Sequence, residues 1–486
     1  MSPLHRLLAV GTAAGALLAG CAHSPVGPDY VAPAPLSAAQ ATSAGPFQSG
    51  SGAAADTALP PNWWQLYQDP RLDALVAQAF EHNTDLRQAV ANFERDQALQ
   101  AEVRGSQKPT VGLSGGPGFG HVSGLTLVQR DYEPPSRFTY SAATTLSYQF
   151  DLFGQLHRAI EAAEAGSGAA QAAVDLVRVN VAGSTARAYA QVCASGLRLR
   201  STRESVRLQE EAVQLAQRLQ QAGKVGEIDT ARARAQLELL RASLPPLQAL
   251  RQNALYRLAT LTGEAPRDFP PEVAACDQPP RVAGLLPVGD GAALLRRRPD
   301  VRQAERSLAA ATARIGVATA ELYPKVVLGL SAGSAGFLNK FGNRESLSYS
   351  LGPLISWTLP STGVAQARIA QAESGTRMAA AHFDGTVLRA LREVETALDA
   401  YARELDRHAA LAAARDQSAT VARQARQLYV TGKTAQLDAL DAMRTLAASE
   451  AALAESAAQL ADDQCAVFMV LGGGWETGAV VAKAAP

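Results

Sequence analysis

The chain has 486 residues, of which 47% are hydrophobic and 19% charged, and its 45 basic side chains equal its 45 acidic ones. With zero net charge and no basic cluster interleaved with aromatic residues, the sequence offers no electrostatic basis for binding nucleic acid. Length alone predicts about three domains, but an internal repeat overrides that estimate.

The first 20 residues are a targeting segment. His5 and Arg6 precede an apolar run that is too short to span a bilayer comfortably, and this run ends in Leu18-Ala19-Gly20-Cys21. An ordinary signal peptide with an incidental cysteine is the alternative, but the small residues stand in register with the cysteine. The segment resembles a bacterial lipoprotein lipobox, which implies cleavage before Cys21, acylation of that residue and, because Ala22 is not acidic, retention in the outer membrane.

Residues 21–60 are rich in Pro, Gly, Ser and Ala, which predicts an extended, acylated tether and not a folded domain. A helix is expected from about Asp69 to Ser106, introduced by the aromatic run Trp63-Trp64-Gln65-Leu66-Tyr67. Lys108-Pro109 ends this helix because proline restricts the residue before it to extended conformations.

Two strands are expected next, at residues 110–118 and 138–150. The second alternates clearly, since every other residue from Phe138 to Phe150 points to the same side. The segment between the two strands carries Gly, Pro and charged residues and is expected to be a loop.

Two stretches of equal length, Gly154 to Gly223 and Gly363 to Gly432, dominate the chain. Both are rich in Ala, Arg, Gln, Glu and Leu and lack proline, which favours helix. Helices of this length extend on the order of 100 Å, so they need partners along their length. The apolar positions that form a helix-packing seam are Val192, Leu199, Val206 and Val213 in the first copy and Leu391, Val394, Leu398, Tyr401 and Leu405 in the second.

Return helices are expected at about 229–262, where Pro245-Pro246 must kink or interrupt the helix, and at about 438–471. The first repeat is thus 61–263, the proline-rich linker 264–289, the second repeat 290–475 and the tail 476–486. The second repeat matches the first because Asp300-Val301-Arg302-Gln303-Ala304 corresponds to Asp85-Leu86-Arg87-Gln88-Ala89. Its strands are expected at 326–337 and 346–359.

The four expected strands are long enough to cross a bilayer at a tilt, whereas no apolar run of transmembrane-helix length follows the targeting segment. Four strands alone cannot close, and their edges would leave unpaired backbone groups in lipid. We therefore expect several chains to supply four strands each to one barrel.

The sequence resembles the TolC-like outer membrane efflux factors, in their lipoprotein (NodT-type) branch, which belong to RND tripartite efflux systems. The resemblance covers essentially the whole mature chain, and the motifs that carry it are Val26-Gly27-Pro28-Asp29-Tyr30, Trp63-Trp64 through Asp69-Pro70, Asp151-Leu152-Phe153-Gly154, Arg297-Arg298-Pro299-Asp300 through Tyr323-Pro324, and the closing Gly-Gly-Gly-Trp.

The resemblance implies a mainly α fold with membrane β-strands, in which two structural repeats per chain each carry long coiled-coil helices and two strands. It implies a homotrimer with a 12-stranded β-barrel in the Gram-negative outer membrane, anchored there by lipid, and an α-helical barrel in the periplasm. It also implies that the trimer is the passive exit duct of a tripartite pump. The expected partners are a periplasmic adaptor (membrane fusion) protein and an inner-membrane RND-type transporter.

The same resemblance implies functional residues beside the two Gly-Lys turns. Asp438 and Asp441 match the positions at which the family places acidic rings that constrict the periplasmic entrance, and their spacing puts both carboxylates on one helix face. Asp229 and Tyr429 are expected to take part, although the first copy departs from the pattern with Arg232. On physical grounds alone, the aspartates could simply favour the positive ends of helix dipoles, and Tyr429 could be simple packing.

The turns themselves resemble the tips that meet the adaptor. Their residues are Gly223 and Lys224 in the first copy and Gly432 and Lys433 in the second.

An enzyme is not expected. Ser114 and Ser331 satisfy a G-x-S-x-G pattern, but hydrolases need that serine at a sharp strand-to-helix turn, and here both lie inside expected strands. We expect no metal site, and no cofactor besides the lipid on Cys21. The other cysteines, Cys193, Cys276 and Cys465, match no zinc spacing, and their pairing is left open.

Two classes of function remain open at this point. The leading one is a passive trimeric exit duct for small molecules, and the alternative is a non-porous structural or adhesive coiled-coil lipoprotein of the outer membrane. The duplicated strand pairs favour the duct. The exported substrate, the cognate adaptor and transporter, and the open or closed resting state cannot be read from the residues.

Overall fold

The computed structural model describes residues 25–34, 45–49, 52–121, 133, 135–266, 270–282, 284–357 and 362–475. Cys21, the targeting segment 1–20 and the tail 476–486 lie outside these residues. Of the helices that the structure describes, none combines the length and the apolar composition needed to cross a membrane.

The chain folds into two compact units that do not coincide with the two sequence repeats, because each unit draws on both repeats. One unit comprises Met1–Pro33, Phe93–Ala170 and Ala304–Phe383, and the other comprises Ala34–Asn92, Gln171–Gln303 and Asp384–Pro486.

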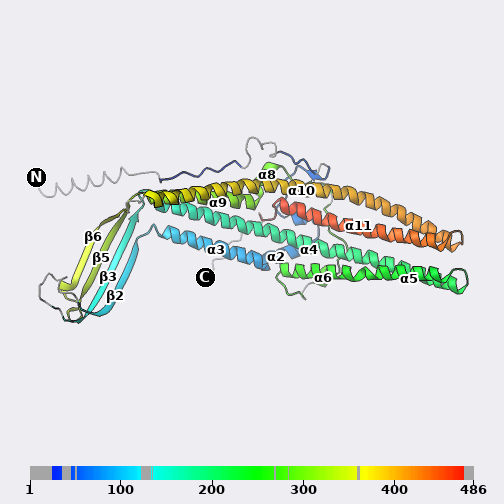
Figure 1. The fold of residues 1–486 in the computed structure, drawn as a ribbon, viewed down its shortest axis with the longest axis horizontal. Coiled ribbons are helices and arrows are strands. Elements are labelled where there is room, and N and C mark those ends of the chain that lie inside the picture. Colours follow the sequence, from blue (N-terminus) through cyan, green and yellow to red (C-terminus); the bar gives the residue numbers. More distant parts are fainter. Residues whose placement is uncertain are drawn as a thin grey trace. The chain divides into compact units, whose positions relative to one another are not determined.

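The first unit contains an antiparallel sheet of four strands in the order β2-β3-β5-β6 (Figure 1). Their bounds are Thr110–Gly120 for β2, Arg137–Phe150 for β3, Lys325–Phe337 for β5 and Leu347–Ser356 for β6. The sheet joins the strand pairs of the two repeats through the β3–β5 ladder. β6 is shorter than expected from the sequence, and residues 358–359 of the expected strand lie outside the described part of the chain.

The beginning of the expected tether is attached to the start of a long helix. Val26 donates its backbone N–H to the Phe153 carbonyl over 3.1 Å. The buried guanidinium of Arg158, in the first turn of α4 (Gln155–Gln221), donates to the carbonyls of Val26 and Gly27 and, over 2.7 Å, to the Asp29 carboxylate. Composition alone could not show this, because the partners of the segment lie more than 120 residues away.

Removing the Arg158 guanidinium is expected to release residues 25–30. Hydrogen bonds to a charged group contribute about 1.5–3 kcal/mol each, so Arg158→Ala should speed amide exchange at Val26 by on the order of 100-fold. Hydrogen–deuterium exchange of the purified protein measures this. Arg104→Ala is the control, since the Arg104–Glu164 ion pair in the same unit is exposed. Equal exchange rates at Val26 in the two variants would show that Arg158 does not hold residues 25–30 in place.

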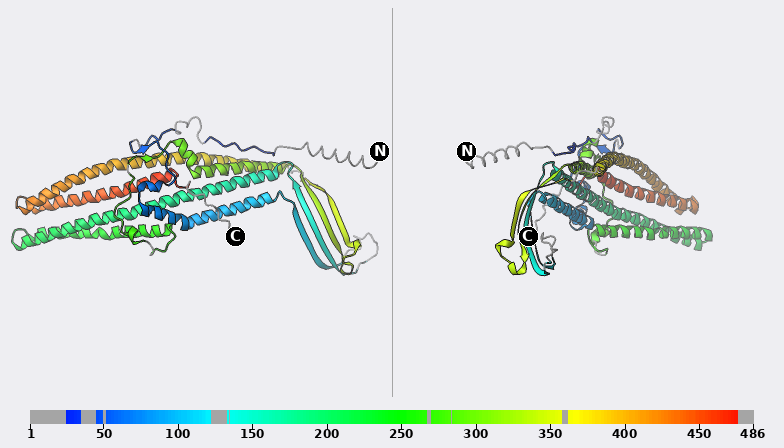
Figure 2. Two further views of the ribbon diagram at one scale, coloured as in Figure 1. Left: turned by 180° about the vertical axis from the view of Figure 1, so that it is seen from behind. Right: turned by 60° about the vertical axis from the view of Figure 1, so that its left-hand side comes forward.

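Long antiparallel helices build the second unit. α4 is followed by α5 (Glu227–Ala242) and α6 (Leu244–Leu261), and α10 (Thr362–Val430) is followed by α11 (Gln436–Val470). Figures 1 and 2 show α11 lying beside α10, and the Ser418 and Ser449 hydroxyls are hydrogen-bonded across that pair. The expected interruption before Pro245-Pro246 occurs at Ser243.

The predicted packing seams are buried in this unit. Val192, Leu199, Val394, Leu398 and Tyr401 are almost wholly inaccessible. The fold class is confirmed, since the chain is mainly helical, with two repeats that each hold long helices and two strands.

The expected single helix at 69–106 is in fact two helices, α2 (Pro70–His82) and α3 (Thr84–Gly105). Asn83 separates them because its side chain serves two partners. Its Oδ1 accepts from the Leu86 N–H and its Nδ2 donates to the Leu261 carbonyl, each over 3.0 Å. The second repeat breaks at the equivalent place, Arg298, between α8 (Gly291–Arg297) and α9 (Pro299–Ala320).

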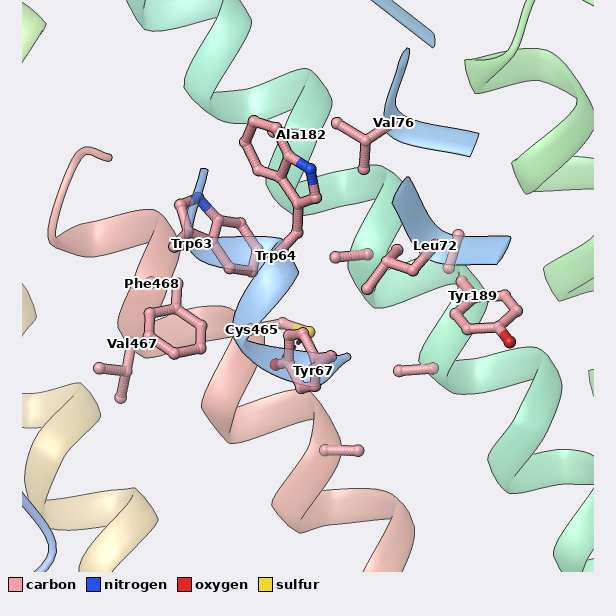
Figure 3. Close-up of a cluster of buried hydrophobic side chains, with 14 of the residues drawn as sticks. Trp63, Trp64, Tyr67, Leu72, Val76, Ala182, Tyr189, Cys465, Val467 and Phe468 are labelled. Carbon is pink, nitrogen blue, oxygen red and sulfur yellow. Dashed lines mark hydrogen bonds between the residues drawn. The ribbon is translucent and has the colours of Figure 1, made fainter. Parts of the chain in front are cut away.

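The aromatic run before α2 forms the centre of the core (Figure 3). Trp63 is fully buried, stacks on Phe468 of α11 at 4.7 Å and donates its indole N–H to the Gly473 carbonyl. A side chain at Gly473 would overlap Leu59. The closing Gly-Gly-Gly-Trp motif is therefore a docking segment, and its glycines let the backbone approach the aromatic rings closely.

The connection between the repeats is also part of the core and not a free linker. It contains α7 (Pro271–Ala274) and β4 (Leu286–Pro287), and β4 pairs in parallel with β1 (Ala54–Ala55) from the supposed tether. A disulfide joins Cys276 of this connection to Cys193 of α4. Cys465 stays reduced, buried against the Tyr67 hydroxyl.

Replacing the disulfide is expected to lower stability considerably. The bond closes a loop with a sequence separation of 83 residues, which corresponds to about 4–5 kcal/mol in the loop-entropy account. Cys193→Ser/Cys276→Ser should therefore melt well below the oxidised wild type in a thermal scan. Wild type treated with a reductant should melt like the variant, and a melting curve unchanged by either treatment would show that the bond contributes nothing.

Candidate functional site

The sheet has two chemically different faces. Residues paired across an antiparallel ladder point to the same side, so the pairing register defines rows that cross all four strands. One row is apolar throughout and consists of Val111, Leu146, Leu330 and Leu351. The neighbouring row, on the opposite face, consists of Gly112, Thr145, Ser331 and Ser350.

The rows on either side extend this segregation. The apolar face continues through the row Tyr148, Leu328 and Pro353, and the other face through the row Ser114, Ala143, Gly333 and Ser348. Larger apolar residues share the polar face only near the ends of the sheet: Val327 and Leu354 at the end next to the helices, and Phe337, paired with Thr139, at the end next to the loops. The sheet can therefore separate an apolar medium from water.

Aromatic side chains gather at both ends of the sheet. At the loop end Phe119 lies 4.9 Å from Phe138. At the helical end Phe153 stacks on Tyr323 at 4.5 Å, and the exposed Trp357 donates its indole N–H to the Leu322 carbonyl. Aromatic girdles above and below an apolar band are typical of strands that cross an outer membrane.

The two G-x-S-x-G serines belong to this sheet. Ser114 and Ser331 both lie on the polar face, and the Ser331 hydroxyl is hydrogen-bonded to that of Ser350 over 2.8 Å. Neither stands at a strand-to-helix turn, as hydrolase chemistry would require.

The two Gly-Lys turns end the helical hairpins with the same hydrogen bonds. Gly223 and Gly432 have φ of +69° and +72°, and each donates its N–H to the residue three positions earlier. Lys224 and Lys433 each donate to the residue five positions earlier. This is the Schellman arrangement, which requires the left-handed backbone that glycine adopts without strain.

The four predicted entrance residues do not form one cluster. Asp438 and Asp441 line the same groove, which is formed by residues of α10 and α11. Asp438 accepts from the Thr434 hydroxyl over 2.6 Å, whereas Asp441 pairs with Arg444 at 2.7 Å. The two carboxylates therefore share one helix face, but only Asp441 is neutralised by a neighbouring cation.

Tyr429 lies elsewhere, in a cavity of about 360 Å³ between α4, α10 and α11. Burial, and secondarily the charge of Asp229, raise the pKa of the Tyr429 hydroxyl. Asp229 itself lies 3.7 Å from Arg232, the residue by which the first copy departs from the second. Neither Tyr429 nor Asp229 is thus among the residues that line the groove of Asp438 and Asp441.

Sequence reasoning missed the ion pair that links the two hairpins. Arg426 of α10 lies 3.2 Å from Glu211 of α4, next to the Tyr429 cavity. It also did not single out the apolar side chains exposed around the turns, which are Ile228, Leu428, Val430 and Leu437. The ion pair depends on which helix faces meet, so the local sequence gives no signal for it. The apolar residues around the turns are visible in the local sequence, but their exposure depends on the packing of the helices.

The chain is similar to proteins of known family. The family model described as outer membrane efflux protein matches residues 75–264 and 292–473. Nodulation protein T of Rhizobium leguminosarum bv. trifolii is 30% identical over 471 residues, which cover 96% of this chain and 97% of that protein. The solvent efflux pump outer membrane protein SrpC of Pseudomonas putida is 30% identical, with 94% and 96% covered.

Solved structures agree with these matches. The outer-membrane channel OprN superposes with a TM-score of 0.85 at 33% identity, over 93% of this chain and 99% of that one.

Proposed function

The chain belongs to the outer membrane efflux protein family, and from this premise we propose that three copies assemble into one passive exit duct with a 12-stranded barrel. As an outer membrane efflux channel the protein catalyses no reaction, and its periplasmic part is helical. The observation that carries the proposal is the sheet, which has one apolar and one hydroxyl-rich face and ends in the edge strands β2 and β6.

The directions of the edge strands allow several copies to close into one barrel. Each neighbouring pair in the sheet is antiparallel, so β6 runs opposite to β2. A β6 edge can therefore pair with the β2 edge of the next copy and continue the antiparallel pattern around a ring. Such head-to-tail contacts close when the rotation between copies closes, and closure removes the unpaired edge groups that lipid would not tolerate.

The lipid anchor is proposed at Cys21. Pro25 is four positions after it, a span of at most about 14 Å, and residues 25–30 are hydrogen-bonded to the start of α4 directly after β3. An acyl chain on Cys21 would thus enter the membrane close to the helical end of the strands.

The hairpin tips are proposed to form the periplasmic entrance and to meet an adaptor protein that connects to an inner-membrane RND-type transporter. In a trimer Asp438 and Asp441 would each form a ring of three carboxylates. The Arg426–Glu211 ion pair would hold neighbouring hairpins together at a narrow entrance, with Tyr429 lining the same cavity and Asp229 nearby. The exposed apolar residues around Gly223-Lys224 and Gly432-Lys433 suit a protein contact.

The proposed cargo is small organic molecules. SrpC is named for solvent efflux and nodulation protein T for nodulation, so relatives of similar sequence differ widely in what they are named for. This fits a duct that selects weakly, with specificity residing in the transporter. The family match leaves no support for the non-porous structural or adhesive alternative.

The assembly is tested by native mass spectrometry of the purified protein, followed by single-channel recording in planar bilayers. We expect a trimeric mass and a discrete conductance from the same preparation. A folded monomer, or a trimer that remains silent after the Arg426–Glu211 pair is removed by Arg426→Gln, would contradict the proposed duct.

A further inference from the structure

The second unit contains a large cavity lined by α4, α6, α10, α11 and the connection between the repeats. Its volume is about 1170 Å³, which is ample for a small organic ligand. Among the described residues that line it, five arginines face three carboxylates. The cavity is thus positively charged, although the whole chain is neutral.

Two of the three carboxylates already form ion pairs with arginines that line the cavity. Asp277 pairs with Arg200 at 2.8 Å, and Glu204 pairs with Arg207. The third, Glu450, forms no ion pair with another described residue, and burial, opposed by the charge of Arg415, raises the pKa of its carboxyl. The carboxylates therefore do not balance the remaining arginines.

Arg203 and Arg251 are the two arginines of this cavity that form no ion pair with another described residue. Arg251 donates to the Ala274 carbonyl, which is neutral, and within the described part of the chain Arg203 has no hydrogen bond or ion pair. Burial and then the charge of Arg203 lower the pKa of Arg251, whereas the charge of Asp277 raises it. The guanidinium groups of Arg203 and Arg251 are therefore the ones in this cavity that an added anion can bind without breaking an ion pair.

The wall that carries Asp277 is fixed in place before any ligand arrives. The Cys193–Cys276 disulfide ties it to α4. At Gly196, which also lines the cavity, a Cβ would overlap the Cys276 carbonyl. The backbone of the connection thus lies directly on α4, so the cavity does not have to form on binding, which reduces the ordering cost of association.

The cavity is also lined by apolar side chains, which include Leu197 of α4 and Leu453 and Ala454 of α11. We propose that this cavity binds a small organic carboxylate, with its charged group between Arg203 and Arg251 and its apolar body against α4 and α11. An inorganic anion would leave the apolar wall in water, and a neutral molecule would leave the two arginines unpaired.

The test is isothermal titration of the full-length protein with 1-naphthaleneacetate and with its neutral counterpart, 1-naphthaleneacetamide. We expect the carboxylate to bind wild type about tenfold or more tightly than the amide, a difference of about 1.4 kcal/mol. Arg203→Gln/Arg251→Gln should reduce the affinity for the carboxylate to that for the amide and leave the amide unaffected. Glu450→Gln should strengthen carboxylate binding, a gain that misfolding cannot produce.

Arg234→Gln/Arg257→Gln is the matched control, because it removes the same charge from α5 and α6 at exposed residues outside the cavity. It should bind both compounds like wild type. Equal affinity of wild type for the two compounds, no binding of either, or an equal loss in the control pair would overturn the proposal.

Discussion

Replacing Asp438 with asparagine is expected to lower the preference of the open channel for cations over anions, and more so than the same change at Asp441. Asp438 is held only by the neutral Thr434 hydroxyl, whereas Asp441 already has the Arg444 guanidinium at 2.7 Å. In a trimer the first substitution removes three uncompensated charges from the entrance. We expect the permeability ratio to fall by a factor on the order of three, measured as the reversal potential in a salt gradient.

The complementary variant tests the reason for this difference. Arg444→Gln frees the Asp441 carboxylate and should raise the cation preference, which Asp441→Asn in the same background should then remove. All three effects should weaken at high ionic strength, because exposed charges are screened. If Asp438→Asn and Asp441→Asn both leave the reversal potential unchanged, neither carboxylate faces the ion path.

The helices and strands follow closely from the sequence because local signals determine them. Gly223 and Gly432 end their helices through a left-handed backbone that few other residues adopt, so the position of each turn can be read from one residue. The strand alternation likewise reports the two faces of the sheet. These features need no knowledge of distant partners.

The features of the fold that sequence analysis missed depend on distant partners. Asn83 breaks a helix because its side chain reaches the Leu261 carbonyl. Residues 25–30 are extended, as their composition indicates, but Arg158 decides whether they are free. Three cysteines allow three pairings, and only the fold places Cys276 against Cys193.

The same distinction between local signals and distant partners applies to the candidate site. The spacing of Asp438 and Asp441 predicts that they share one helix face, and both residues line one groove. Arg444 stands three residues after Asp441, so their ion pair also has a signal in the local sequence. By contrast, the sequence could not show that Tyr429 faces away from that groove, because the packing of α10 against α4 decides this.

The largest loss of assembly is expected when a charge is placed on the apolar face of the sheet. Leu330 lies in the middle of β5, in the row of four apolar side chains that spans the sheet. Arginine on the lipid face of a membrane strand costs about 2–4 kcal/mol near the bilayer centre, and a trimer would carry this cost three times. Leu330→Arg should therefore yield little trimer in outer membrane fractions, as judged by gel mobility without heating.

The neighbouring residue provides the control. Ser331 follows Leu330 in the same strand and points to the opposite face, toward Ser350. If that face lines water, Ser331→Arg should assemble normally, since its guanidinium stays hydrated, and should shift the channel toward anions through a ring of three positive charges. Loss of assembly in Ser331→Arg but not in Leu330→Arg would assign the faces the other way round, and equal tolerance of both would mean that neither face meets lipid, so that the sheet would not be a membrane wall at all.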